Sequence, residues 1–257
     1  MNYKLWVRLT TCDKSDFSYK DINFIIPFWQ YSGFDLTDSF YISLPEVLRP
    51  PFDYVLRLVK SAGSDERVKG IMCTNTDELM LLRKCGFDKC VISGPGIYAF
   101  NNESIAFIEE YSDRFVYPYE LNVHELKDLK RSYGILNVYG RTPLMISANC
   151  IRKSANTCNK GQGDLFGKLT DRKKTDFPVL FQCDSCYNII YNSLPTSLHE
   201  YLGSKIDFTE DLMLSFSDED SLLRGKIMDF YQNRINGKDD PCPFKEFTKA
   251  YFYHGVD

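Results

Sequence analysis

The sequence predicts an α/β protein: a partial, TIM-like β/α half-barrel, then a cysteine-rich β module and a small C-terminal α/β segment. Three observations predict this class. Short β-branched and aromatic runs alternate with helical patterns in the first half of the chain. Successive strands begin about 21 to 28 residues apart, which is the period of β/α units. The helical period then disappears between Ile146 and Phe181. We therefore place the domains at residues 1–148, 149–205 and 206–257.

The expected strands are runs of β-branched and aromatic residues, at Phe40–Ser43, Val68–Cys73, Lys89–Ser93, Arg114–Tyr117 and Leu136–Tyr139. The expected helices repeat apolar residues every three or four positions, at Asp53–Lys60, Thr76–Lys84, Asn102–Glu110 and Val123–Ser132. Gly86 is expected to end the second of these helices and Gly134 the fourth, because glycine favours the backbone conformation that follows a helix. A last helix is expected at Ser221–Ile235.

Five strands and four helices amount to about half of an eight-stranded barrel of roughly 250 residues. The runs Leu5–Leu9 and Phe24–Phe28 could add one or two strands ahead of Phe40. We therefore expect either an open sheet or a piece of a larger barrel. A second subunit or a missing N-terminal barrel half would complete the latter.

Composition is typical of a globular chain with a real core: 44% of residues are hydrophobic and 26% charged. The net charge of −4 excludes a strong overall positive field for nucleic acid. No segment approaches the roughly 20 apolar residues that span a bilayer, and no signal-like run opens the chain. We expect a cytoplasmic protein without a membrane partner. Its nine cysteines would stay reduced there, so some of them call for a metal or for packing.

Four cysteines form the most informative pattern of the second half. Cys183 and Cys186 are a C-x2-C pair, a spacing at which two thiolates reach one metal ion. Cys150 follows an expected strand at Leu144–Ser147, and Cys158 lies in a polar stretch. Between residues 149 and 175, seven basic residues stand against two acidic ones, and such charges lower thiol pKa values. We favour a metal centre at these four cysteines. An iron–sulfur cluster is the best candidate for it, and a structural zinc is the rival. The alternative without a metal is that the four are buried free cysteines.

Several blocks of the chain resemble peptidase family U-32, the collagenase-like group. The most specific block is Tyr139-Gly-Arg-Thr-Pro-Leu-Met145; others are Leu169–Val179, Cys183–Ser193 and the tail Phe247–Val256. The resemblance covers roughly residues 40 to 257. It implies a β/α barrel followed by a 4Fe–4S cluster held by Cys150, Cys158, Cys183 and Cys186. The family's first barrel strands have no counterpart here.

The resemblance also implies a function. Members with an understood role take part in dioxygen-independent hydroxylation of RNA bases or of a ubiquinone precursor, with prephenate implicated in some. The family's older name implies proteolysis. The implied partners are therefore RNA or a small carboxylate or aromatic substrate. The rivals are a peptidase and a non-catalytic module stapled by zinc or a cluster.

Glu120 and Arg141 are the candidate catalytic residues, because each falls at or just after the C-terminal end of an expected strand. Arg141 would clamp a carboxylate and Glu120 would accept or orient a proton. The alternative for each is a structural ion pair, for which the other residue is one candidate partner. The three histidines His124, His199 and His254 lie in no recognisable nucleophile or zinc-protease motif.

Overall fold

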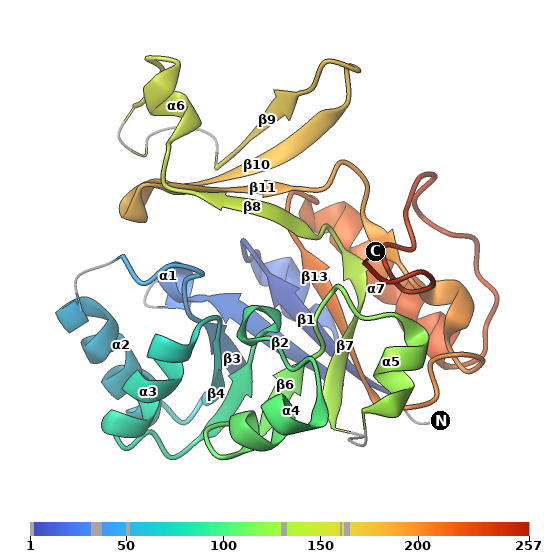
Figure 1. Ribbon diagram of the computed structural model, residues 1–257, viewed down its shortest axis with the longest axis horizontal. Coiled ribbons are helices and arrows are strands. Elements are labelled where there is room, and N and C mark those ends of the chain that lie inside the picture. Colours follow the sequence, from blue (N-terminus) through green and yellow to red (C-terminus); the bar gives the residue numbers. More distant parts are fainter. Residues whose placement is uncertain are drawn as a thin grey trace.

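The computed structural model describes residues 3–31, 38–49, 52–129, 133–159, 161 and 165–256. Two sheets organise these residues (Figure 1). A large sheet is rolled up and ringed by helices, and a smaller sheet lies above one end of it.

The large sheet is a closed barrel of parallel strands in the order β7-β13-β1-β2-β3-β4-β5-β6, with β6 pairing back to β7. The eight strands are β1 (Lys4–Leu9), β2 (Ile22–Pro27), β3 (Phe40–Ser43), β4 (Val68–Cys73), β5 (Cys90–Ser93), β6 (Arg114–Val116), β7 (Gly134–Gly140) and β13 (Asp211–Phe216). The expected half-barrel is therefore wrong. The barrel closes within this one chain.

Closure depends on β13, which sequence analysis assigned to a separate C-terminal segment. This strand inserts between β1 and β7 and runs parallel to both. Asp211, at its start, is buried and accepts hydrogen bonds from Trp6 Nε1 at 2.7 Å and Arg114 Nη1 at 2.8 Å. A buried carboxylate needs such donors, so Asp211 ties β13 to β1 and β6.

Most expected elements are confirmed within a few residues. The helices are α1 (Phe28–Tyr31), α2 (Phe52–Ser64), α3 (Thr76–Lys84), α4 (Asn102–Glu109), α5 (Val123–Asp128), α6 (Ile151–Ser154) and α7 (Ser221–Ile235). Asn75, Asn101 and Asn122 cap α3, α4 and α5. The expectation that Gly134 ends the helix before it is wrong, because α5 ends at Asp128 and Gly134 is the first residue of β7. A Cβ there would come within 2.4 Å of the Tyr117 ring.

The second sheet, called here the small sheet, is antiparallel in the order β8-β11-β10-β9. Its strands are β8 (Pro143–Ser147), β9 (Phe166–Thr170), β10 (Asp176–Gln182) and β11 (Tyr187–Tyr191), followed by β12 (Thr196–Ser197), which pairs with β7 of the barrel. Its own buried cluster is small: Leu180, Tyr187, Ile189 and Tyr191. The cysteine-bearing segment therefore forms strands and turns, although β8 already begins within the segment assigned to the barrel.

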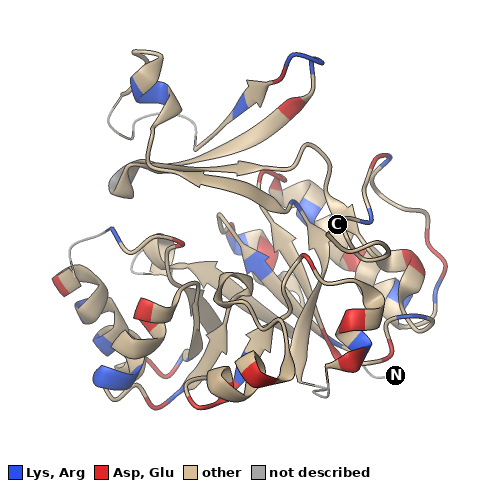
Figure 2. Ribbon diagram, in the orientation of Figure 1, with Lys and Arg blue, Asp and Glu red and all other residues tan. Residues whose placement is uncertain are grey.

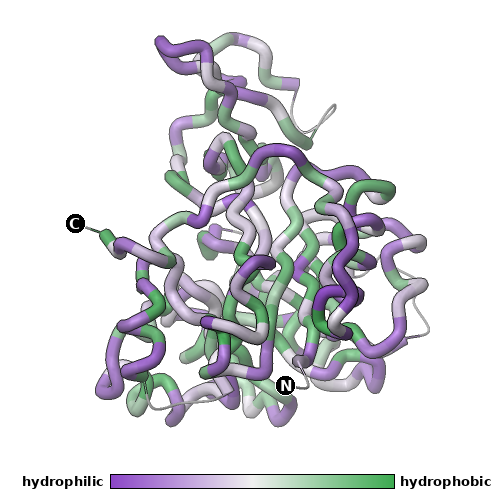
Figure 3. Tube along the Cα trace, turned by 90° about the vertical axis from the view of Figure 1, so that its right-hand side faces the viewer, coloured by the Kyte–Doolittle hydropathy of each residue, from purple (hydrophilic) through white to green (hydrophobic). Residues whose placement is uncertain are grey.

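Apolar residues fill the barrel and the space between strands and helices. Side chains from seven strands, among them Trp6, Met72 and Met213, form one buried cluster, and two larger clusters pack helices against the strands. Figure 3 shows hydrophobic strands in the centre and hydrophilic segments outside. Among the residues that the structure describes, no helix has the length and apolar character needed to cross a membrane.

Candidate active site at the barrel mouth

A cavity of about 350 Å³ lies where the barrel strands end and the small sheet begins. Loops that follow β3, β5 and β6 line it from below, together with Arg8 of β1 and Thr74, and β8 lines it from the small sheet. We call it the mouth cavity. Its residues are Arg8, Glu46, Thr74, Pro95, Gly96, Tyr98, Tyr119, Glu120, Pro143, Leu144, Met145 and Ile146. The C-terminal ends of barrel strands carry the active sites of characterised β/α barrels, and the cavity lies at that end.

Arg8 and Glu46 form an ion pair in the wall of this cavity. Both side chains are largely buried, with 16% and 19% of their surface exposed. Burial alone would lower the pKa of Arg8, but the Glu46 carboxylate beside it reverses the effect and raises that pKa. Arg8 Nη2 also lies 3.4 Å from Ser43 Oγ. The pair is therefore an internal, charge-balanced unit.

Glu120 lines the mouth cavity four residues after the end of β6, as its sequence position predicts. It is half-buried, and no other described residue forms a hydrogen bond or ion pair with it. Arg141 follows β7 but does not line the cavity. Its Nε donates to Asp218 Oδ1 at 2.7 Å, and its Nη1 donates to the carbonyls of Asn192 and Ser193. The two candidates are thus not paired with each other, and Arg141 joins β7 to the segments around it.

A carboxyl that sequence analysis did not single out lies behind the cavity wall. Glu78, in the first turn of α3, is fully buried. Its Oε2 accepts from the backbone N–H of Thr74 at 2.7 Å and lies 3.2 Å from Thr74 Oγ1. Burial raises the pKa of Glu78 to about 8, and the nearby Glu46 adds to the shift. The protonated form therefore predominates at neutral pH.

The hydrogen bonds from Thr74 oppose the effect of burial on Glu78, because donors to a carboxyl oxygen stabilise its charged form. The Thr74 hydroxyl is a weak donor here, since Oγ1 lies 3.2 Å from Glu78 Oε2 and donates at 2.7 Å to the carbonyl of Pro45. The other oxygen, Glu78 Oε1, is buried without a partner in the described part of the chain. A neutral acid is the form that such a site tolerates.

Tyrosines surround the polar wall of the cavity. Burial raises the pKa values of Tyr119, Tyr187 and Tyr191, so all three remain phenols at neutral pH. Tyr98 lies at the rim with 52% of its surface exposed and holds a left-handed backbone, φ 59°. Its ring stacks on Phe100 at 5.4 Å between centroids. Such a conformation is uncommon outside glycine and is often found at functional sites.

The four candidate cysteines lie on segments that meet at one end of the small sheet. Cys150 follows β8 and Cys186 precedes β11, which pair next to this end through Ser147 and Asn188. Asn188 Nδ2 donates to the carbonyl of Asn149 at 3.0 Å. A Cβ on Gly161, three residues after Cys158, would lie 3.5 Å from Cys183 Cβ. The folded chain thus brings the four segments together.

The cysteine side chains do not form a ready-made metal site in the part of the chain that the structure describes. Within the described ranges, no three His, Cys, Asp or Glu side chains are grouped so as to hold a metal ion. Burial raises the pKa of Cys183 and the nearby Cys150 and Cys158 contribute, while Arg152, 4.0 Å from its sulfur, opposes the rise. Four thiols on converging loops next to an arginine suit a thiolate-bound cluster in chemistry. A rearrangement of side chains is needed to bind one.

The mouth cavity and the cysteines are connected through the loop after β3. Glu46 lines the cavity, Val47 packs against the buried cluster of the small sheet, and Arg49 Nη1 donates to the carbonyl of Cys186 at 3.0 Å. Cys186 itself has a left-handed backbone, φ 50°. One short loop therefore contacts both places.

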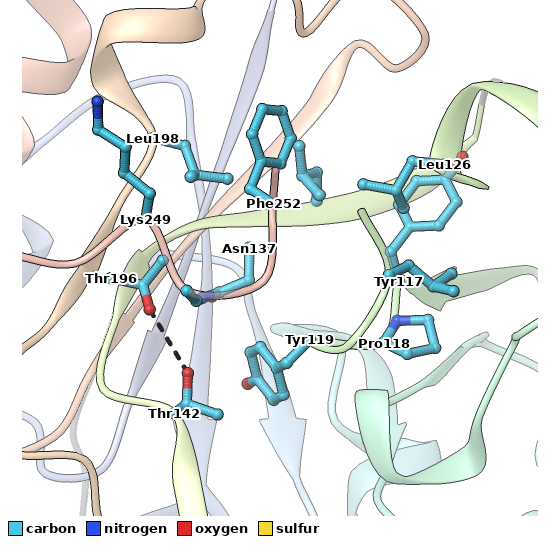
Figure 4. A pocket seen from close by; sticks show the side chains of 13 residues that line it. Tyr117, Pro118, Tyr119, Leu126, Asn137, Thr142, Thr196, Leu198, Lys249 and Phe252 are labelled. Carbon is cyan, nitrogen blue, oxygen red and sulfur yellow. Dashed lines mark hydrogen bonds between the residues drawn. The ribbon is translucent and has the colours of Figure 1, made fainter. Parts of the chain in front are cut away.

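A second, much smaller cavity of about 30 Å³ lies between β7 and the C-terminal tail (Figure 4). Asn137, Thr142, Thr196, Lys249 and Phe252 are among its lining residues. The hydroxyls of Thr142 and Thr196 approach to 3.5 Å across it. This volume holds one or two water molecules, so it is not a substrate site.

A buried serine–histidine contact also lies near this tail. Tyr231 OH donates to the carbonyl of Val138 at 2.9 Å, so Ser197 must donate to Tyr231 at 2.7 Å. His199 Nδ1, 2.8 Å from Ser197 Oγ, is then the donor to the serine. A catalytic base must accept the serine proton. This chain of bonds runs in the opposite direction, and Phe230, Phe244 and Phe247 pack around the histidine.

Basic residues of the small sheet lie far from the mouth cavity. Arg172, Lys173 and Lys174 are exposed at the turn between β9 and β10, and Lys153 is exposed on α6 (Figure 2). Lys168 pairs with Asp176 at 2.6 Å. Lys160 and Asp164, which belong to the same charged stretch of sequence, lie outside the described residues. Lys153, Arg172, Lys173 and Lys174 therefore lie on solvated tips of the small sheet, whereas Arg152 of the same stretch stacks on the Phe181 ring.

Sequence analysis did not single out Arg8, Glu46 or Glu78. Arg8 lies within the possible strand Leu5–Leu9 and Glu78 within the expected helix Thr76–Lys84, whereas Glu46 lies in a segment with no assigned element. Chain position could have indicated both glutamates. Glu46 and Glu78 each come within five residues after the end of a strand, and the same kind of position made Glu120 a candidate. Arg8 sits within β1, and only its pairing with Glu46 distinguishes it.

Comparison with known proteins adds no relative. No protein-family profile, no curated protein and no solved structure matches this chain.

Proposed function

We propose that this chain is an iron–sulfur-dependent enzyme that hydroxylates an aromatic ring without dioxygen, the ring being a small molecule or an RNA base. The supporting observation is that the four cysteine segments and a ring-sized cavity both lie on the small sheet. The cavity is at the end of the barrel where characterised β/α barrels have their active sites. The resemblance to peptidase family U-32 supplies the reaction type.

The reaction would exchange a ring hydrogen for the hydroxyl of an organic donor, so that the ring is hydroxylated and the donor becomes R–H. A 4Fe–4S cluster held by Cys150, Cys158, Cys183 and Cys186 would supply one-electron chemistry. The protein groups have other tasks. Glu120 holds a polar edge of the ring, and the apolar face of β8 covers it and excludes water.

Two rivals remain from the sequence. A structural zinc on the same cysteines uses the same thiols and gives no colour. A peptidase would need a nucleophile with an accepting base. The Ser197–His199 contact is buried and oriented the wrong way for that task, which favours the oxidative proposal.

The test is anaerobic purification of the full chain with iron, sulfide and zinc analysis. We expect about four irons per chain and broad absorbance near 400 nm. Serine substitution at each of Cys150, Cys158, Cys183 and Cys186 should abolish both. Cys242→Ser is the matched control, because Cys242 lies in the tail and should leave the colour intact. One zinc ion per chain without iron would show instead that the cysteines hold a structural zinc.

A further inference from the structure

We infer that the mouth cavity selects a planar ligand with a cationic or N–H-donating edge and disfavours a carboxylate. The inference rests on the proposed function for its setting and names the ligand class of that site. It derives from the charges and surfaces that line the cavity.

The charge balance of the wall is negative. Arg8 is the cation among the lining residues, and Glu46 neutralises it. Glu120 then remains as a carboxylate that no other described residue pairs. Carboxylate oxygens accept hydrogen bonds, and charge-assisted donors satisfy them best. A ligand carboxylate would meet like charge instead.

Arg141 does not change this balance. It is the residue that would clamp a carboxylate, but its guanidinium is bonded to Asp218, Asn192 and Ser193 outside the cavity. Recruiting it would break an ion pair and two bonds to backbone carbonyls. The site therefore offers an anion no uncommitted guanidinium among the described residues that line it.

The remaining wall suits a flat ring. Leu144, Met145 and Ile146 of β8 line the cavity and are 53%, 57% and 44% exposed, so β8 contributes apolar surface there that the rest of the described protein leaves uncovered. Tyr98 presents its ring at the rim, and an aromatic face attracts a cation. An aromatic ring beside a carboxylate, under an apolar cover, is a combination that recognises planar cations.

Three probes of nearly the same shape test the inference on the full-length protein: benzamidine (cation), benzamide (neutral) and benzoate (anion). Calorimetric titration should give the affinity order benzamidine, benzamide, benzoate. Glu120→Gln should weaken benzamidine about tenfold and change benzamide less than about twofold. Glu103→Gln, on the exposed start of α4, is the control and should change neither.

Benzoate binding as tightly as benzamidine would overturn the inference, as would the absence of binding by all three at millimolar concentration. A charge preference that survives Glu120→Gln would also overturn it. Each variant is first checked for an unchanged urea unfolding midpoint. The iron content reports separately on the proposed function, because the order of the three affinities does not depend on a cluster.

Discussion

Arg8 of β1 and Glu46 of the loop after β3 form an ion pair that spans the β2 strand lying between them in the barrel. The pair lines the mouth cavity, and its carboxylate also acts on Glu78 behind the wall. Two residues 38 positions apart thus cancel each other's charge in the cavity wall, which leaves Glu120 as the unpaired carboxylate among the described lining residues.

Glu46→Gln should destabilise the protein by about 3 kcal/mol, because it leaves the largely buried Arg8 without its counter-charge. Urea unfolding followed by tryptophan fluorescence measures the change. Asp176→Asn, which breaks the exposed Lys168–Asp176 pair, is the control and should have almost no effect. Equal effects of the two substitutions would show that the Arg8 pair is not buried.

Glu78 should make stability fall as pH rises. Its unfolded pKa is near 4.5 and its folded pKa about 8, so the folded state holds one more proton between these values. The contribution of Glu78 to the free energy of unfolding is fully present below pH 4.5. As the pH rises from there to 8, this contribution falls by about 1.4 kcal/mol per pH unit. The difference between the unfolding free energies of wild type and Glu78→Gln, measured across this range, isolates the effect. A pH-independent difference would contradict a raised pKa.

Gly140→Ala should lower the free energy of unfolding by more than about 3 kcal/mol. The backbone of Gly140 has φ +138°, and a Cβ there would lie 2.2 Å from the carbonyl oxygen of Ser215 in β13. Thermal and urea unfolding measure the loss. Gly203→Ala, at φ +71° with open space around it, is the control and should cost about 1 kcal/mol. If both cost the same, crowding between β7 and β13 is not the cause.

Arg141→Met should lower stability by about 2 kcal/mol and leave benzamidine binding unchanged, because Arg141 holds neighbouring segments and does not line the cavity. Asp218→Asn should reproduce part of the stability loss, since it weakens the same ion pair. Unfolding and calorimetric titration of the same preparations give both readings. A loss of binding without a loss of stability would restore Arg141 as a ligand clamp.

The sequence was informative wherever structure depends on neighbouring residues. Apolar spacing placed α3 and α7 at their observed bounds and located five barrel strands, since burial of one face imposes a local period. Chain position after a strand also placed Glu120 in the cavity. The segments of the four cysteines meet at one end of the small sheet, and the metal centre proposed for them stays a prediction.

Tertiary structure alone decided three matters: the closure of the barrel by β13, the pairing of Arg8 with Glu46, and the pairing of Arg141 with Asp218. Each joins residues far apart along the chain. Such contacts form when the strands roll into a ring, and nothing in the local pattern of a six-residue apolar run distinguishes a barrel strand from a strand of a separate segment. The sequence therefore determined which elements form, whereas the packing of the whole chain determined which charges were left in the cavity.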